Sequence, residues 1–378
     1  MPIQQLFGSS QPFGINIVKE LIFNKKWLIL EIDWNVWSLD IKSLDLFDCF
    51  TSDELDQLRT SPNTFFMFSF LWEGNSYKEY NYYELISAAG IKHNIPPEKL
   101  FFISSNILEE QSFDDWQKVK YPDYKINVIS FSYFAWSSTN FVKPVSIDQT
   151  VANIKNNPKF FISLNRRIRA LRTYTIYKIF TSRIKDNTLL SFPKLEPADL
   201  IISRVNSDAF FQVCQSSPSI LDVSDFETNW ATHPPNAASP NELYKNSMIS
   251  LVSESLFRTC ENTSLFYTEK TFKPMLYNHP LIIFGQAGLN TSLNKIGFKY
   301  YNKHFDLSFD TIDDHHDRID AQIHQIEKLN DQLLSMTVGQ KIDWILQDME
   351  TMEHNKQALI DQKFNRSKLQ KLIELTNT

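Results

Sequence analysis

Glycine is scarce in this sequence, at 8 of 378 residues. Loops that wrap phosphates with backbone N–H groups need several glycines at fixed spacing, and neither the dinucleotide fingerprint nor the P-loop pattern is present. Any phosphate bound by this chain must therefore be held by side chains and by a helix N-terminus. Cysteine is scarce as well. Cys49, Cys214 and Cys260 lie far apart, which excludes the spacing of a zinc site and fits a reducing compartment.

Long hydrophobic runs are also missing. The longest apolar stretches, such as "FFMFSFLW" and "PLIIFG", have the length of strands and are too short to span a bilayer. The first 20 residues lack the basic region and apolar run of a signal peptide. We therefore expect no transmembrane segment and a cytoplasmic protein, in which contact with a membrane would be peripheral. The net charge of -6 makes nucleic acid an improbable partner for the whole chain.

Apolar runs alternate with amphipathic segments along the chain, which predicts an α/β fold with mostly parallel sheets. Strands are expected at 26–33, 64–70, 100–106, 126–131, 159–165, 247–255, 280–285 and 298–301. Helices are expected at 80–94, 107–119, 166–184, 268–278 and 289–297, followed by two polar helices between 313 and 375. The polar stretch 140–158 suggests a boundary, so the predicted domains are 1–150, 151–335 and a C-terminal bracing helix at 336–378.

The segment "TEKTFKP" at 268–274 gathers charge at the start of a predicted helix. Thr268 is a suitable N-cap, and Glu269 in the first turn suits the helix dipole. Lys270 and Lys273 do not, because cations are unfavourable there unless an anion is bound as well. The N–H groups, the dipole and two ammonium groups could then converge on one phosphate. An ordinary capped helix is the alternative.

Acidic residues precede this helix. Glu254 lies at the end of the predicted strand "SLVSES", and Glu261 and Glu269 are separated by seven residues. The carboxyl ends of parallel strands are where open α/β sheets bind ligands. A carboxylate at this edge can accept hydrogen bonds from both hydroxyls of a ribose.

A second charged cluster lies in "SLNRRIRALRTY" at 163–174. Asn165 is placed at a strand exit, where it can cap a helix or contact a ligand. On a helix beginning at 166, Arg166, Arg169 and Arg172 share one broad face and Arg167 points elsewhere. Four cations at a helix N-terminus suggest an anionic partner such as a diphosphate. The alternatives are a solvated basic face and pairing with the acid-rich tail.

Several other residues are weaker candidates. Asp33 and Glu73 follow apolar strands, and either could be a general base. Asn106 is expected to form a turn and His279 to pack or cap. The sequence "DDHHD" at 313–317 is expected to supply an N-cap rather than a metal site, and no metal or other cofactor is expected.

The segments "VSES", "LFYTEKTFKPMLYNHPLIIFG" and "FISLNRRIRALR" resemble the C-terminal region of bacterial and phage glycosyltransferase-like proteins. The Glu and T-E-K pattern is also similar to that of fucosyltransferases. The spacing of the acids resembles that of retaining GT-B enzymes, and "NHP" resembles the His-Pro motif of enzymes that use CMP-sialic acid. The resemblance covers about residues 159–320. The chain lacks the glycine that usually follows the first strand in these proteins, so the resemblance does not define the acceptor-binding site.

This resemblance implies a GT-B architecture of two Rossmann-like domains and a metal-independent glycosyltransferase. The partners would be a nucleotide-sugar donor and a glycan or lipid-linked acceptor, as in surface polysaccharide synthesis. Glu269 would contact the ribose, and Lys270, Lys273 and Arg166 would contact the phosphates. Glu254 would contact the donor sugar or its phosphate. The full set of predicted site residues is Glu254 and Asp33 for catalysis, and Asn165, Arg166, Arg169, Glu261, Thr268, Glu269, Lys270 and Lys273 for the donor. The rival interpretation is a non-enzymatic protein that binds nucleic acid or another anion through Arg166–Arg172.

Overall fold

The computed structural model describes residues 25–31, 45–48, 50–71, 74, 78, 81–156, 158–165, 169–192, 205, 220–221, 241–257 and 263–377. The chain divides into two compact units, each assembled from separated segments. Unit 1 contains Met1–Tyr133, Thr259–Phe266 and Lys363–Thr378, and unit 2 contains Phe134–Arg258 and Tyr267–Gln362. The C-terminal segment 336–378, expected as one bracing element, is therefore shared between the two units.

Unit 1 contains a parallel sheet of four strands in the order β1-β2-β3-β4. Its strands are β1 (Lys26–Glu31), β2 (Thr64–Phe70), β3 (Leu100–Ser104) and β4 (Asn127–Ser130), and its helices are α3 (Ser52–Thr60), α5 (Tyr82–Lys92), η3 (Pro97–Lys99), α6 (Glu109–Lys120) and α17 (Lys363–Asn377). Every residue of β2 is buried, as its continuous apolar sequence requires. Rings of Phe68, Tyr82 and Phe102 lie against one another in the core.

The C-terminal helix α17 completes unit 1. The side-chain amide of Asn365 exchanges two hydrogen bonds with the backbone of Ser132, at 2.9 and 3.0 Å. Glu110 accepts hydrogen bonds from Lys368 at 2.6 Å and Lys371 at 2.8 Å. Burial opposes ionisation of Glu110, but these two lysines and the backbone of Ser130 still lower its pKa. The helix is thus fixed to unit 1 by polar contacts that its sequence alone does not indicate.

Residues 263–266 form a second inserted piece of unit 1. The amide of Asn106 donates to the Thr263 carbonyl and accepts from the Leu265 N–H, both at 2.9 Å, while the Ile107 N–H donates to the Leu265 carbonyl. Asn106 also accepts from the Leu108 N–H, which confirms its expected role in a turn. Phe266 lies against Gly74, where an added Cβ would be only 2.3 Å from the Cβ of Phe266. This segment is therefore closely fitted to unit 1.

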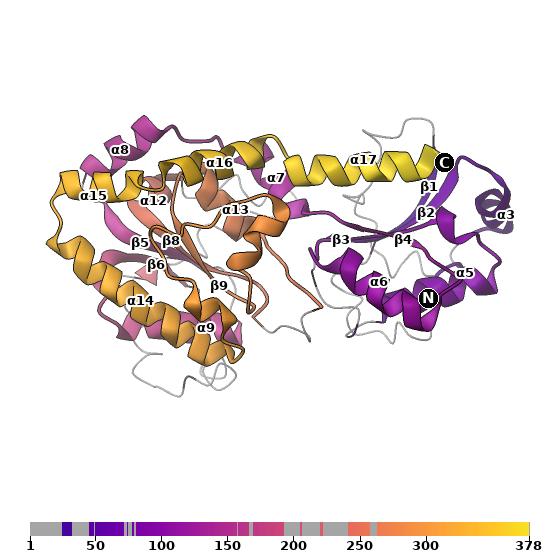
Figure 1. The fold of residues 1–378 in the computed structure, drawn as a ribbon, viewed down its shortest axis with the longest axis horizontal. Helices are drawn as coiled ribbons and strands as arrows, with labels where there is room; N and C mark the ends of the chain where they lie inside the picture. The colour runs from indigo at the N-terminus through magenta and orange to yellow at the C-terminus, as the bar shows by residue number, and fades with distance from the viewer. Residues whose placement is uncertain are drawn as a thin grey trace. The chain divides into compact units, whose positions relative to one another are not determined.

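Unit 2 contains a parallel sheet of five strands in the order β7-β6-β5-β8-β9. Its strands are β5 (Lys159–Leu164), β6 (Thr188–Ser191), β7 (Ile220–Leu221), β8 (Ser247–Ser253) and β9 (Leu281–Phe284). Its helices are α7 (Tyr133–Phe141), α8 (Ile147–Lys155), α9 (Ala170–Thr181), η4 (Lys185–Asn187), α12 (Asn241–Lys245), α13 (Glu269–Leu276), η6 (Thr291–Ile296), η7 (Ser308–Thr311), α14 (His315–Ser335), α15 (Val338–Leu346) and α16 (Met349–Ile360). Helices α9 and α14 pack together on one face, and α8 with α15 and α13 with α16 on the other (Figure 1). Both units are therefore α/β with parallel sheets, compatible with a Rossmann-like fold.

The structure differs from the expectation in two regions. Residues 298–301 form no strand, because the backbone of Lys299 bonds the side chain of Asn355 through both its N–H and its C=O. The tail between 313 and 375 contains four helices rather than two. It is interrupted at Asp348, which accepts from the Lys303 N–H, and at Gln362, whose φ is 53°.

Candidate functional site

The sheet of unit 2 has a topological switch point between β5 and β8. From β5 the chain passes to β6 and β7 on one side, and it then returns to β8 and β9 on the other side. In open parallel sheets, ligands bind outside the carboxyl ends of the strands at such a point, because the two crossover connections diverge there. The segments that leave β5 and β8 at this edge lead to α9 and α13, and they contain most of the predicted site residues.

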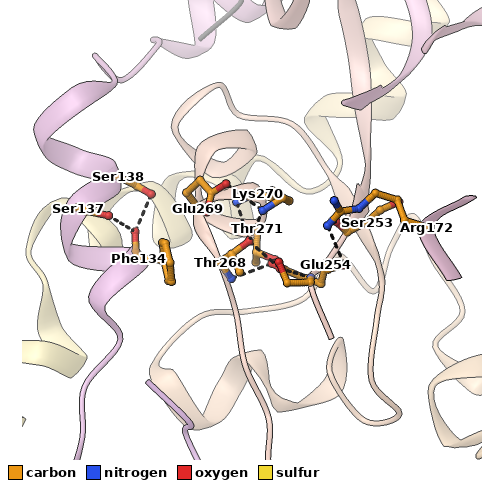
Figure 2. Close-up of polar contacts among 11 residues, drawn as sticks. Phe134, Ser137, Ser138, Arg172, Ser253, Glu254, Thr268, Glu269, Lys270 and Thr271 are labelled. Atoms are coloured by element: carbon orange, nitrogen blue, oxygen red, sulfur yellow. Dashed lines mark hydrogen bonds and ion pairs between the residues drawn. The ribbon is translucent and has the colours of Figure 1, made fainter. Parts of the chain in front are cut away.

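Glu254 directly follows β8, and its side chain is completely buried. Its carboxylate accepts four hydrogen bonds, from the N–H and hydroxyl of Thr268, the hydroxyl of Thr271 and the N–H of Ser255, at 2.6–3.1 Å (Figure 2). Its own N–H donates to the Phe284 carbonyl at 2.8 Å. Glu254 therefore ties the end of β8 to the start of α13, and this geometry favours a positioning role over contact with a substrate.

Thr268 is the N-cap of α13, as predicted, and Glu269 lies in the first turn. The Thr268 hydroxyl accepts from the Lys270 N–H at 3.4 Å, and the Thr268 carbonyl accepts from the Thr271 N–H at 3.1 Å. Two first-turn N–H groups are thus already bonded within the helix. Recognition of an anion at this terminus would rest on side chains and on the dipole rather than on these N–H groups.

The charged side chains at this terminus remain partly accessible. The Lys270 ammonium donates to Glu269 Oε1 at 2.9 Å and to Thr268 Oγ1 at 3.1 Å, and the two charged side chains are 25% and 22% exposed. Burial acts to raise the pKa of Glu269, but the charges of Lys270 and Lys273 and the Lys270 hydrogen bond lower it to about 2. Lys273 is half-buried. An anion entering here would meet two ammonium groups and one carboxylate that is ionised at neutral pH.

The arginine cluster is arranged differently from the prediction. Helix α9 begins at Ala170, and Arg169 is its N-cap with an extended backbone (φ -147°, ψ 142°), so Arg169 and Arg172 do not share a helical face. The physical reason is that an N-cap residue lies outside the helical repeat. Arg172 is buried, and its guanidinium donates to the carbonyls of Ser253 at 3.5 Å and Glu254 at 3.2 Å. It therefore braces the end of β8 rather than forming part of a solvated basic face.

Asn165 follows β5 and is buried at the switch point. Its N–H donates to the hydroxyl of Ser191, at the end of β6, and its side-chain N–H donates to the hydroxyl of Ser163, both at 3.0 Å. The structure thus brings Asn165, Arg172, Glu254 and the start of α13 to one edge of one sheet.

Four predicted residues lie outside the described part of the chain. These are Asp33, Glu73, Glu261 and Arg166, and Arg167 of the arginine cluster lies outside it too. Their predicted roles stay predictions.

Two weaker candidates have structural roles. His279 is buried beside the stacked rings of Tyr244 and Tyr277, and its Nδ1 lies 3.1 Å from the Ser250 hydroxyl. Burial lowers its pKa to about 4, so it is neutral and packs as expected. Asp314 caps α14 by accepting from the N–H groups of His316 and Asp317, which confirms the capping prediction.

Two groups among the described residues have ligand atoms close enough to hold a metal ion. They are Asp314 with His315 and His316 in unit 2, and Asp45 with Asp48 and His93 in unit 1. Asp45 is already engaged, because it accepts from Lys92 at 2.6 Å and lies 2.8 Å from His93 Nε2. Neither group includes a residue of the switch-point site.

The sequence did not single out Thr271 or Arg318. Thr271 follows the cap by three residues on the same side of α13, and that T-x-x-T spacing is the only local signal for its bond to Glu254. Arg318 is buried and donates to the carbonyls of Phe257, at 3.1 Å, and Gly285, at 2.8 Å. It fixes the segments that leave β8 and β9, and nothing in its sequence neighbourhood predicts this.

Comparisons with protein-family models, with characterised proteins and with solved structures gave no match. Among the described residues, no helix is both long enough and apolar enough to cross a membrane.

Proposed function

We propose that this chain is a glycosyltransferase of the GT-B type, which moves a sugar from a nucleotide-sugar donor to a hydroxyl of a glycan or lipid-linked acceptor. The observation that carries the proposal is the partly exposed Glu269–Lys270 pair at the N-terminus of α13, fixed through Thr268 and Glu254 to the switch point of the unit 2 sheet. The resemblance of the T-E-K-T-F-K-P segment to glycosyltransferase-like proteins supplies the reaction class.

Sugar transfer leaves negative charge on the departing nucleotide phosphate. Lys270, Lys273 and the positive end of the α13 dipole would stabilise that charge, since preorganised cations lower the barrier when they face developing charge. Glu269 competes for the same ammonium groups in the free protein, and it also offers a carboxylate to the ribose hydroxyls. No divalent ion is required for this step, because the side chains themselves supply the positive charge.

Within this proposal Glu254 is a positioning residue. Its four hydrogen bonds hold Thr268 and Thr271, and through them the orientation of the first turn of α13. If the reaction inverts the configuration of the sugar, a second carboxylate would deprotonate the acceptor hydroxyl, and Asp33 is the predicted residue for this role.

The test is a thermal-shift screen of the full chain with UDP, GDP, CMP and their sugar conjugates, followed by a transfer assay with the conjugate that stabilises it. Lys270→Ala should weaken the binding of the selected nucleotide at least tenfold, about 1.4 kcal/mol. Lys299→Ala is the matched control, because Lys299 belongs to the same unit and forms an exposed pair with Glu350. Unchanged affinity of the Lys270 variant, or no stabilisation by any ligand of the panel, would refute the proposal.

Binding of nucleic acid is the less favoured function. Arg172 is buried against backbone carbonyls, so it is not available to a phosphate backbone. A strongly salt-dependent affinity for single-stranded DNA, with no response to sugar nucleotides, would reverse this preference.

A further inference from the structure

Small polar side chains line the carboxyl edge of the three central strands of unit 2. Ser191 ends β6, Asn165 follows β5 and Ser253 ends β8. The register pairs Ile162 with Ser250, and continuing it by three residues places Asn165 opposite Ser253. Residues in register on parallel strands face the same side of a sheet, so Asn165 and Ser253 are neighbours at the switch point.

Asn165 is held in one orientation. Its backbone N–H and its side-chain N–H are both bonded, to Ser191 and Ser163, at 3.0 Å each. Its side-chain oxygen is buried and has no hydrogen-bond partner among the residues that the structure describes. The amide is therefore fixed by its donors, while its acceptor atom has no partner within the described part of the chain.

Ser253 shows the same pattern. Its carbonyl accepts from Arg172, but within the described part of the chain its buried hydroxyl has no partner. Figure 2 shows Ser253, the last residue of β8, beside Glu254 and Arg172. Leaving a polar atom buried without a hydrogen bond costs free energy, and such atoms call for an explanation. Among the described residues, a ligand bonded to both atoms would account for two of them in register at one switch point.

We propose that Asn165 and Ser253 form a subsite that recognises hydroxyl groups of the ligand bound at this edge. A carbonyl oxygen can only accept, so it repels a phosphate and suits a hydroxyl donor, whereas a serine hydroxyl can donate and accept. In this arrangement Lys270 would bind the anionic part of the ligand, and Asn165 and Ser253 would bind its hydroxyl-bearing part. The choice of a sugar nucleotide as ligand rests on the proposed function, but the pair is tested by binding alone. The hydroxyls can belong to the ribose or to the transferred sugar.

The experiment compares the wild-type chain with Ser253→Ala and Asn165→Ala by calorimetry. The probes are UDP, UDP-glucose, GDP, GDP-mannose and inorganic pyrophosphate. Ser69→Ala is the matched control, because Ser69 in β2 is also a buried serine whose hydroxyl has no partner among the described residues. Each site variant should lose five- to tenfold in affinity for the sugar nucleotide, keep its affinity for pyrophosphate, and differ from the control. Equal losses for the nucleotide and its sugar conjugate assign the hydroxyls to the ribose, and a loss confined to the conjugate assigns them to the sugar.

A second readout is independent of ligand. Removing an unused buried hydroxyl should leave the urea midpoint of the free protein unchanged or raise it, so a lowered midpoint for Ser253→Ala would overturn the inference. Equal affinities of the wild type and both variants for every probe would also overturn the inference, while leaving the Lys270 site intact. A loss of affinity that includes pyrophosphate would overturn it as well. A chain that binds sugar nucleotides through this pair but transfers no sugar would retain the inference and lose the proposed function.

Discussion

Replacing Glu254 by glutamine separates a positioning role from direct participation in catalysis. The carboxylate accepts from the Thr268 N–H with one oxygen and from the Ser255 N–H with the other. A glutamine has one acceptor oxygen, so in either orientation its NH₂ group faces one of these N–H groups. The threonine hydroxyls can rotate to compensate, but a backbone N–H cannot.

The expected loss follows from these contacts. One buried N–H without a partner costs about 1–3 kcal/mol, and the remaining bonds lose the gain of a charged acceptor, so the total is about 2–4 kcal/mol. For a unit of this size the loss corresponds to a fall of roughly 5–15 °C in Tm. Glu353→Gln is the control, because Glu353 is 47% exposed and its ion-pair partner among the described residues is Lys356, which predicts a loss of less than about 1 kcal/mol.

Differential scanning calorimetry provides the assay. Sugar-nucleotide binding is measured in parallel, well below the transition. A Glu254→Gln chain that melts with the wild type but transfers no sugar would refute the positioning role and make Glu254 a catalytic residue.

Three further predictions concern charge and the C-terminal helix. Glu269→Gln should lower the free energy of unfolding by up to about 3 kcal/mol above pH 4.5. The pKa of Glu269 is lowered to about 2 in the folded chain, so its carboxylate stabilises the fold above the ordinary pKa of 4.5, and this contribution is lost as the pH falls from 4.5 to 2. Urea titrations across that pH range should show the difference, and equal stability of variant and wild type would contradict the prediction. The pKa of Glu109 is shifted in the opposite direction, because burial raises it to about 7 despite hydrogen bonds from Tyr83 and neighbours. Unit 1 should therefore lose stability as the pH rises from 4.5 to 7. Glu109→Gln should flatten this slope and stabilise unit 1 at pH 8 by up to about 3 kcal/mol, as measured by the same titrations. Asn365→Ala should cost unit 1 about 2–4 kcal/mol by leaving two backbone groups of Ser132 unbonded, whereas Ser367→Ala on the exposed side of α17 should cost less than about 1 kcal/mol; equal melting temperatures would show that α17 is dispensable.

The sequence predicted the sheet strands well where burial is continuous. The runs at 64–70 and 159–165 are apolar because both faces of a parallel sheet are covered, and both form strands. Thr268 and Asp314 could be recognised as caps because capping depends on the next three residues alone. The parallel α/β class was therefore accessible from local pattern.

Contacts between distant parts of the chain could not be predicted in this way. The sequence shows that Arg172 is a cation near a helix start, but its bonds to Ser253 and Glu254 depend on which strand lies beside β5. The position of Lys299 beside Asn355 likewise overrides the strand propensity of 298–301. The proposed subsite likewise depends on the register of β5 and β8, which pairs Ile162 with Ser250 and, when continued by three residues, places Asn165 opposite Ser253.

The discontinuity of unit 1 limits how the gene can be divided. A fragment that stops at residue 150 omits residues 263–266 and α17, so Asn106 loses its backbone partners and Glu110 loses both of its lysines. Expressing the first half alone would therefore expose surfaces that the whole protein covers, and we expect aggregation rather than an isolated folded unit. Dissection would require joining residue 133 to residue 363 and supplying the short inserted segment as a peptide.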